Sequence, residues 1–316
     1  MKVLFISSGN TAFGISPITK NQGNSLNNFG VEIFYFPIIG KGLINYIKNI
    51  FLLKRHLSIN KYDIIHAHYS FSAFVAALAY AKPLVVSLMG SEVEDGYLSK
   101  LFIKIFHKFS WRYTIVKSAR MINSLGLTNI SISVVIPNGV DTDTFNSMNK
   151  RVCQKQLGWD YNKKHILFAA NPSRPEKNYA LAKQAFSILN KGNVELHSLI
   201  DVSPEQMPLW MNSADVVLLV SLWEGSPNVI KEALACNRPI VSTDVGDVCW
   251  LLGKTPGCYI VSFDPEDVAV KLKMALEFSE KKGQTKGRDK IIELGLDSET
   301  IAKRIISVYN SILGKV

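Results

Sequence analysis

The sequence has 316 residues, of which 47% are hydrophobic and 20% are charged. Its length predicts two domains that each bury a core, and its composition excludes intrinsic disorder, collagen-like repeats and a coiled-coil rod. The net charge of +10 is uneven, because residues 1–150 hold 15 Lys and Arg against 7 Asp and Glu. This excess predicts an anionic partner for the first half, either a nucleic acid or a membrane surface.

The chain begins with MKVLFISSGN, in which the apolar run is too short for a signal peptide. The most apolar stretch, residues 71–81, ends at Lys82 and Pro83, well before the roughly 20 residues of a membrane-spanning helix. The four cysteines form no CxxC pair, so neither a zinc ribbon nor a dithiol redox centre is indicated. We therefore expect a cytoplasmic chain with reduced thiols.

Short apolar runs alternate with helix-length segments through the first half of the chain. These runs are typical of buried strands and occupy residues 3–7, 31–36, 63–68, 83–88 and 133–137. Strands separated by helices build parallel sheets through right-handed βαβ crossovers. The first half is therefore expected to be a doubly wound α/β domain.

The second half repeats this pattern. Its predicted strands are residues 165–170, 194–200, 214–221, 239–244 and 258–262. Residues 136–150 are rich in Pro, Asn, Gly, Asp and Ser, which indicates a linker with a boundary near residue 147. We expect domains over 1–147 and 148–297, with the last helix, about 298–316, packing back on the first. Two doubly wound domains facing across a cleft would bind ligands at the carboxyl ends of their strands.

A basic helix is predicted in the first domain, where residues 98–120 carry six Lys or Arg and no acid. Lys100, Lys104, Lys108 and Arg112 recur every four residues beside a face of Leu, Ile and Phe, a pattern typical of helices that lie on anionic lipid. A core-packed helix with a charged outer face is the alternative. No DNA- or RNA-binding module is recognisable, so we expect an anionic membrane surface as partner and no nucleic acid.

Two groups of acids resemble metal sites. The acids at positions 92, 94 and 95 follow a strand and are interpreted as solvated. Asp141 and Asp143 lie inside the linker and are interpreted as turn residues. No metal and no cofactor is expected.

The strongest signal for chemistry is EGSPNVIKEALA, residues 224–235, which follows an apolar strand. It places Glu224 near the end of the strand and Glu232 inside the next helix. A carboxylate at position 232 lies beside the helix start and suits ribose hydroxyls. The alternative is an ordinary capped helix with a solvated Glu232.

The turn between these two acids predicts an anion site. We expect Gly225, Ser226, Pro227 and Asn228 to form the turn, with Ser226 as N-cap and Pro227 as the first helical residue. The amides of Asn228 and Val229 would then point from the helix amino end toward an anion such as a diphosphate.

Two acids separated by seven residues in a strand-turn-helix setting resemble the signature of retaining nucleotide-sugar glycosyltransferases of the two-Rossmann GT-B type, family 4 above all. The resemblance covers nearly the whole chain, because residues 136–145 resemble the linker motif and residues 246–252 lie where the family has a Gly-rich turn. The sequences at 7–17, 63–70 and 226–237 are similar to a bacterial subgroup that builds surface polysaccharides and teichuronic acid.

This resemblance implies metal-independent transfer of a hexose from a UDP- or GDP-linked sugar to a lipid-linked or glycan acceptor, with retention. Because the basic helix predicts membrane contact, we expect the protein at the inner face of the cell membrane. It implies that Glu224 contacts the donor sugar and Glu232 its ribose. In the family, a basic pair after the first strand of the second domain holds the diphosphate. Lys177 matches that pattern, whereas Asn171 stands in place of the expected Arg and Arg174 is the candidate replacement.

In the first domain the family often has a His-Gly pair after the fourth strand, and this chain has Met89 and Gly90 there. His68, at the end of an earlier strand, is the candidate to face the cleft, and a core histidine is the alternative. The loop over residues 7–17 contains Gly14, whose backbone could approach the diphosphate or acceptor.

Two other functions are compatible with these motifs. One is a sugar-nucleotide epimerase of the same shape, which needs a donor but no acceptor. The other is a degenerate donor-binding scaffold, to which Met89 and Asn171 point because both depart from the family's pattern.

Overall fold

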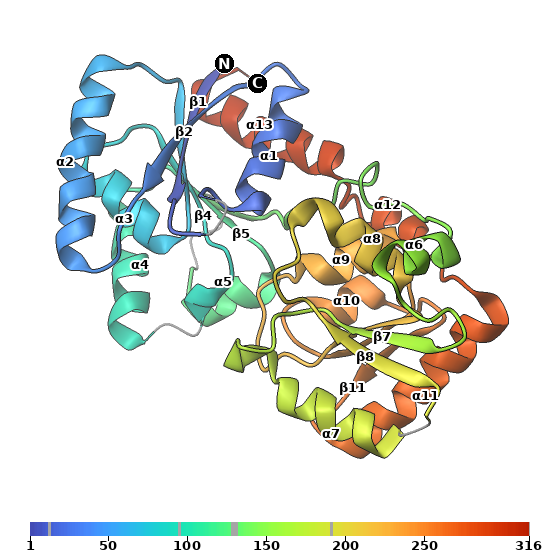
Figure 1. Cartoon of the computed structure of the whole chain (residues 1–316). Coiled ribbons are helices and arrows are strands. Elements are labelled where there is room, and N and C mark those ends of the chain that lie inside the picture. The colour runs from blue at the N-terminus through green and yellow to red at the C-terminus, as the bar shows by residue number, and fades with distance from the viewer. Residues whose placement is uncertain (12–13, 94–95, 128–131, 190–191, 316) are drawn as a thin grey trace. The chain divides into compact units, whose positions relative to one another are not determined.

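The computed structural model describes residues 1–11, 14–93, 96–127, 132–189 and 192–315. Contacts divide the chain into two units, the first made of Met1–Gly139 with Ser298–Val316 and the second of Val140–Asp297 (Figure 1). Each unit is a parallel sheet covered by helices on both faces, so the predicted pair of Rossmann-like α/β domains is confirmed.

The sheet of the first unit has the strand order β2-β1-β3-β4-β5-β6, and every neighbouring pair is parallel. Its strands are β1 (Lys2–Ser8), β2 (Glu32–Ile38), β3 (Ile64–His68), β4 (Leu84–Ser87), β5 (Tyr113–Val116) and β6 (Ser133–Val135). The central strands are apolar and buried because helices cover both faces of the sheet. Every strand of this sheet except β5 was predicted from the sequence.

Helices lie on the two faces of this sheet, with α2 and α3 on one and α1 on the other (Figure 1). They are α1 (Pro17–Asn27), α2 (Leu43–Ile59), α3 (Ser70–Leu78), α4 (Tyr97–Phe109) and α5 (Ala119–Leu125). Because α4 ends at Phe109, Arg112 lies beyond it, and the prediction that Arg112 continues the basic stripe is wrong. Within the described residues, no helix combines the length and apolarity needed to cross a bilayer.

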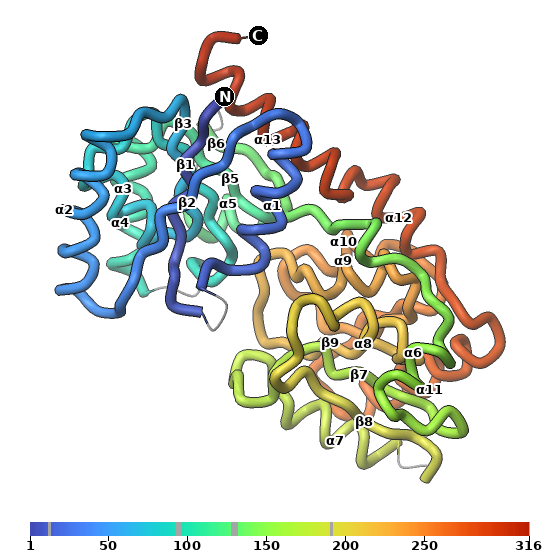
Figure 2. Tube along the Cα trace, turned by 45° about the horizontal axis from the view of Figure 1, so that its top comes forward, coloured from blue at the N-terminus to red at the C-terminus, as the bar shows by residue number. Residues whose placement is uncertain are grey.

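The last helix, α13 (Ser298–Leu313), belongs to the first unit and runs beside α1 (Figure 2). Its apolar face contains Ile301, Ile305 and Tyr309, all buried. The Tyr309 hydroxyl lies 2.6 Å from Nδ1 of His66 in β3, and this polar contact fixes the helix against the sheet interior.

The sheet of the second unit has the order β11-β10-β9-β7-β8, again parallel throughout. Its strands, all found from the sequence, are β7 (Lys164–Phe168), β8 (Val194–Ser198), β9 (Val216–Leu219), β10 (Ile240–Thr243) and β11 (Cys258–Val261). The chain runs from β7 outward to β8, then crosses back to β9 on the other side of β7. Doubly wound sheets bind ligands in the crevice outside the carboxyl ends of the strands at which the order reverses, which are β7 and β9 here.

Helices cover both faces of this sheet as well, with α7 and α11 packed together on one face. The helices are α6 (Lys150–Leu157), α7 (Tyr179–Leu189), α8 (Met207–Ser213), α9 (Asn228–Ala235), α10 (Val248–Leu252), α11 (Pro265–Lys282) and α12 (Gly287–Glu293).

The second unit begins at Val140, before the predicted boundary at residue 147. The Val140 amide donates to the Leu296 carbonyl at 2.9 Å, and Arg288 donates to the carbonyls of Thr142 and Phe145. The segment that was predicted as a linker is therefore attached to the second unit by one backbone hydrogen bond and by the Arg288 side chain.

Candidate active site

The crevice of the second unit brings together two predicted residues from different loops. Lys177 ends a short 3₁₀ turn, Pro175–Lys177, in the loop after β7, and Glu224 lies in the loop after β9. The Lys177 ammonium forms an ion pair with Oε1 of Glu224, and the two side chains are 12% and 14% exposed. A ligand that carries phosphate and hydroxyl groups can replace this ion pair, because Lys177 can then bind the phosphate and Glu224 the hydroxyls.

The loop that carries Glu224 is held in place by neighbouring segments. The Ser221 hydroxyl donates to Oε1 of Glu224 at 2.8 Å, and the Thr243 hydroxyl at the end of β10 donates to the Ser221 carbonyl at 2.8 Å. The Leu222 amide donates to the Glu176 carbonyl at 2.8 Å, which joins the loop after β9 to the loop after β7. The carboxylate of Glu224 is therefore oriented before any ligand binds.

Gly246 packs directly against this turn. Its φ of +59° is unfavourable for other residues, and a Cβ placed there would lie 2.5 Å from the Gly225 carbonyl oxygen. Only glycine allows the loop after β10 to approach the backbone of Glu224 and Gly225 so closely. This contact gives a physical reason for glycine at the start of the segment 246–252.

The helix that follows Glu224 begins one residue later than predicted. Pro227 has ψ of 117° and is the N-cap, so α9 starts at Asn228 and the prediction of Ser226 as N-cap is wrong. The Ser226 hydroxyl instead accepts a hydrogen bond from the Lys231 ammonium at 3.1 Å. Among the described residues no side chain caps α9, so the amides of Asn228 and Val229 at its amino end are the donors to which an anion would bind.

Glu232 lies in α9 with its side chain half-buried. Burial raises its pKa to about 7, and the positive charge of Lys231 opposes that rise. Because it is half-buried, the side chain is neither fully solvated nor closed to a ligand. The hydroxyl groups of a ribose would donate hydrogen bonds to this carboxylate and would stabilise its ionised form, which burial disfavours.

Lys231 is part of this site although the sequence analysis did not single it out. Its side chain is fully buried, and burial lowers its pKa to about 8 against the attraction of Asp247 and Glu232. Lysines in helices are mostly exposed, so the local sequence gave no signal that this one would lie beneath the turn. Its contact with Ser226 stabilises the turn from inside the domain.

Arg174 and Asn171, the other candidates for the diphosphate, use their polar atoms within their own loop. Arg174 Nε donates to Oε1 of Glu176 at 2.6 Å, and the Arg174 side chain is 57% exposed. Asn171 Oδ1 accepts from the Ser173 amide at 2.9 Å. The structure thus pairs Lys177, and not Arg174, with Glu224.

His68 is buried in the first unit, with 2% of its surface exposed. Its ring packs on Phe5 and on His66, and burial together with the charge of Lys117 lowers its pKa to about 3. The prediction that His68 faces an open site is wrong, because β3 is central in the sheet and both of its histidines point into the interior.

Glu92, interpreted above as solvated, is also buried. Its carboxylate accepts hydrogen bonds from the amides of Ser70, Met89 and Gly90 at 2.8–3.2 Å. The interpretation as a solvated acid is therefore wrong for Glu92, which fixes the loop after β4. Residues 94–95 lie outside the described residues.

The two remaining predicted residues, Asp141 and Gly14, both lie in loops. Asp141 accepts hydrogen bonds from the Asp143 and Thr144 amides and from the Thr144 hydroxyl, so its interpretation as a turn residue is confirmed. Gly14 has φ of +70° in the loop after β1, where its amide donates to the Thr11 carbonyl at 3.0 Å.

Both halves of the chain match models of glycosyltransferase families. Residues 16–144 match the Glycosyltransferase Family 4 model, and residues 160–277 match the model described as Glycosyl transferases group 1. The Escherichia coli UDP-Gal:alpha-D-GlcNAc-diphosphoundecaprenol alpha-1,3-galactosyltransferase is 26% identical over 299 residues, which cover 79% of this chain and 77% of that enzyme.

Other relatives are similar over different lengths. The Bacillus subtilis glycosyltransferase TuaC, named for teichuronic acid biosynthesis, is 26% identical over 216 residues, 61% of this chain and 56% of TuaC. The structure of Anabaena HepE in complex with UDP and glucose has a TM-score of 0.77 at 15% identity, over 98% of this chain and all of that one. A glycosyltransferase domain matches in each of the two Rossmann-like units, so the chain belongs to the family 4 glycosyltransferases of GT-B fold.

Proposed function

We propose that this glycosyltransferase moves a hexose from a UDP-linked sugar to a lipid-diphosphate-linked glycan, with retention at the anomeric carbon and without a divalent metal. The observation that carries the proposal is the ion pair of Lys177 and Glu224 at the crevice between β7 and β9. A cation and a helix amino end beside it suit a diphosphate, and the carboxylate suits sugar hydroxyls.

In the proposed reaction the bond between the anomeric carbon and the diphosphate oxygen breaks. Lys177 and the amides of Asn228 and Val229 stabilise the negative charge that grows on the departing diphosphate. The acceptor hydroxyl forms the new bond from the same face, and its proton passes to a diphosphate oxygen. Glu224 orients the sugar through its hydroxyls, and Glu232 accepts hydrogen bonds from the ribose.

Two relatives favour uridine as the donor base. The Escherichia coli relative is named for UDP-Gal and for an acceptor on diphosphoundecaprenol, and the Anabaena structure contains UDP. The diphosphoundecaprenol in the name of the Escherichia coli relative also supports a lipid-linked acceptor, and the name of TuaC supports a role in building a surface polysaccharide such as teichuronic acid.

A binding screen followed by product analysis tests this function. We expect UDP, and not GDP, to raise the melting temperature of the full chain equally with and without EDTA. Incubation with UDP-galactose or UDP-glucose and a polyprenyl-diphosphate sugar should then extend the acceptor by one hexose. Interconversion of the UDP-sugar without acceptor would instead indicate an epimerase, and binding without turnover would indicate a scaffold.

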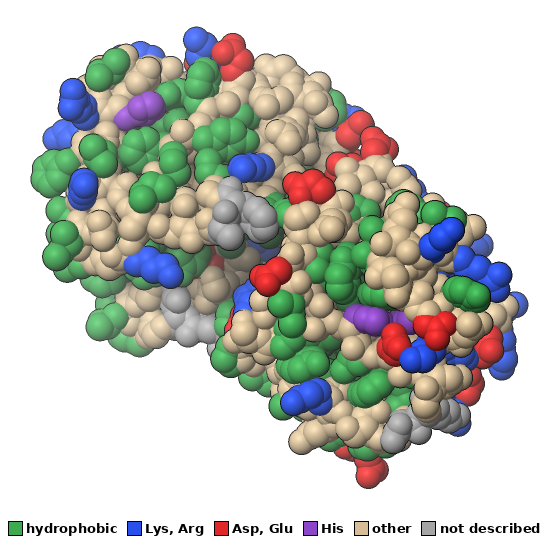
Figure 3. Space-filling view, in the orientation of Figure 1, with side chains coloured by type: hydrophobic (Ala, Val, Ile, Leu, Met, Phe, Trp, Pro, Cys, Tyr) green, Lys and Arg blue, Asp and Glu red, His purple; other side chains and the backbone are tan. Residues whose placement is uncertain are grey.

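We also propose that the first unit contacts an anionic membrane surface through α4. In α4 the apolar side chains opposite the core are exposed, among them Tyr97, Leu98, Phe102 and Phe109. Lys104 and Lys108 lie exposed beside them, and hydrophobic and basic side chains lie together over this part of the first unit (Figure 3). An apolar stripe flanked by lysines is the pattern of an interfacial helix.

Charge reversal tests the membrane surface. Replacing Lys100, Lys104 and Lys108 with Glu should weaken binding to phosphatidylglycerol vesicles by at least about 100-fold, at about 1 kcal/mol for each lysine. Sedimentation with vesicles of graded anionic content measures the effect. The matched control replaces three exposed lysines of the second unit, Lys281, Lys282 and Lys286, with Glu. Equal loss in both variants would mean that net charge alone drives binding and would contradict an α4 surface.

A further inference from the structure

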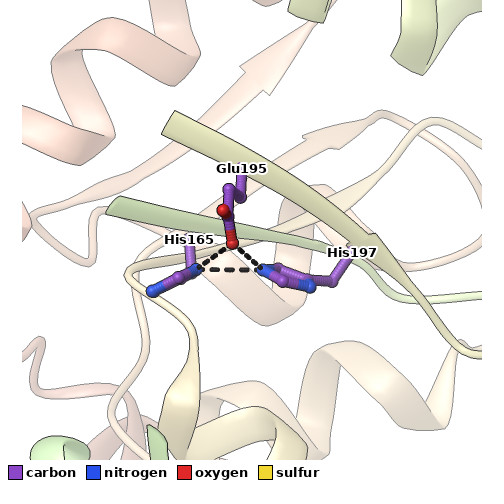
Figure 4. Close-up of side chains that lie close together, drawn as sticks. All are labelled: His165, Glu195 and His197. Atoms are coloured by element: carbon purple, nitrogen blue, oxygen red, sulfur yellow. Dashed lines mark hydrogen bonds and ion pairs between the residues drawn. The ribbon is translucent and has the colours of Figure 1, made fainter. Parts of the chain in front are cut away.

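A second cluster of functional side chains lies in the second unit, away from the donor crevice. His165 lies in β7, and Glu195 and His197 lie in the neighbouring edge strand β8 (Figure 4). The strand register sets His165 opposite Glu195 and Leu167 opposite His197, so all three side chains share one face of the sheet. None of them takes part in the proposed transfer, whose residues follow the carboxyl ends of the strands.

The three ligand atoms lie at the spacing of a metal site. Nδ1 of His165 and Nε2 of His197 are 2.9 Å apart, and each lies 3.6 Å from Oε2 of Glu195. A tetrahedral zinc ion with bonds of about 2.0–2.1 Å separates its ligand atoms by about 3.3 Å. The observed distances lie on either side of this value, so shifts of a few tenths of an ångström are enough to form the site.

Other residues already hold each ligand in the orientation that a metal requires. Nε2 of His165 lies 2.9 Å from the Asp160 carbonyl. Because a carbonyl oxygen only accepts, Nε2 carries the hydrogen of the ring, and Nδ1 keeps a lone pair for a metal. Lys163 donates to Oε1 of Glu195 at 2.6 Å, which leaves Oε2 directed at the two rings. Trp159 stacks on His197 with ring centroids 3.6 Å apart.

The donor set also fits a divalent transition metal chemically. Two imidazole nitrogens and one carboxylate oxygen are typical protein ligands of zinc and leave a fourth position for water.

We propose that His165, Glu195 and His197 form a zinc-binding site that fastens the edge strand β8 to β7. Every residue of β8 is only half-buried, so a metal bridge to the buried His165 adds a strong contact where packing is weak. On binding, the proton now shared between Nδ1 of His165 and Nε2 of His197 moves to Nδ1 of His197. The bridge holds β8 in place, and the proposed transfer reaction does not use the metal.

Zinc titration of the full chain, after stripping with EDTA and dialysis, tests the site. A chromophoric chelator in competition should report one tightly bound equivalent, with a dissociation constant below about 1 μM. Glu195→Gln and His197→Gln should each weaken binding by at least about 100-fold, more than the 10- to 100-fold typical of residues that only support ligands. These two side chains are 34% and 18% exposed, so both variants are expected to fold, unlike variants of the fully buried His165.

Two controls separate this site from adventitious binding. Cys249→Ser removes an exposed thiol, and His56→Gln removes a histidine of the first unit, and both should bind zinc as the parent chain does. Cobalt should give the visible absorption of a four- or five-coordinate ion in the parent and lose it in His197→Gln. Zinc should also raise the melting temperature of the parent and not of Glu195→Gln.

Two results would overturn the proposal. One is the absence of a tight equivalent, and the other is an affinity that survives both Glu195→Gln and His197→Gln. These measurements use no sugar donor, so their outcome is independent of the proposed transferase reaction.

Discussion

Lys177→Ala is expected to lower kcat by about 10²- to 10³-fold, the cost of removing one preorganised group that stabilises developing charge. The structure places the Lys177 ammonium against Glu224 at the ligand crevice, where a departing diphosphate would need it. The KM for the UDP-sugar should change much less, because the charge on the diphosphate grows in the transition state.

Steady-state kinetics with a UDP-sugar and a lipid-linked acceptor measure this effect. Lys177→Arg should recover part of the rate, since it restores the positive charge without the same geometry. Lys183→Ala is the matched control, because Lys183 is exposed on α7 in the same unit. Near-normal kcat in Lys177→Ala would contradict the assignment. If the melting temperature of Lys177→Ala falls so far that unfolding explains the lost activity, Lys177 acts by holding Glu224 and not by stabilising the diphosphate.

Glu232→Gln is expected to have two opposite effects, on stability and on donor binding. Burial raises the pKa of Glu232 to about 7, well above its ordinary value of 4.5. Between these two values the folded state keeps a proton that the unfolded state has released, so the contribution of Glu232 to stability falls as the pH rises. A neutral amide of similar size avoids this cost.

The free energy of unfolding of Glu232→Gln should therefore exceed that of the parent by about 1–3 kcal/mol at pH 8. The difference should vanish near pH 4, where both states of the parent hold the proton. UDP affinity should fall by about 10- to 100-fold, as expected when a hydrogen bond to a charged group is lost.

Urea denaturation at pH 4 and pH 8, with UDP calorimetry at pH 8, measures both effects. Glu277→Gln, on α11 of the same unit, is the control for removal of one carboxylate. Unchanged UDP affinity would reject the ribose contact. A loss of stability at pH 8 would show that the carboxylate is stabilised in the folded state, contrary to its raised pKa.

Much of the fold follows from the sequence because buried parallel strands leave a continuous apolar signal. Every strand of the second sheet was found in this way. The strand β5 (Tyr113–Val116) was missed because it lies inside the basic segment 98–120, which was interpreted as one helix, whereas α4 ends at Phe109. The early end of α4 also removed Arg112 from the basic stripe, since a run of regularly spaced lysines does not specify where a helix stops.

For the candidate site, too, some features follow from the sequence and others depend on tertiary packing. The sequence by itself determined that Glu224 and Glu232 flank a turn, because both lie in one short segment. Only the tertiary structure decided that Lys177 meets Glu224, that His68 is buried, and that Lys231 lies beneath the turn. Local sequence specifies a residue's place along a strand or helix, whereas its partners and burial depend on which elements pack against it.

The cluster of His165, Glu195 and His197 shows most clearly that tertiary structure decides which side chains meet. These residues come from two strands separated by a helix, and no sequence motif joins them. The parallel register of β7 and β8 alone sets their distances. Sheet order and register arise from packing over the whole domain, which is why the sequence determined the architecture while the tertiary structure decided which side chains meet.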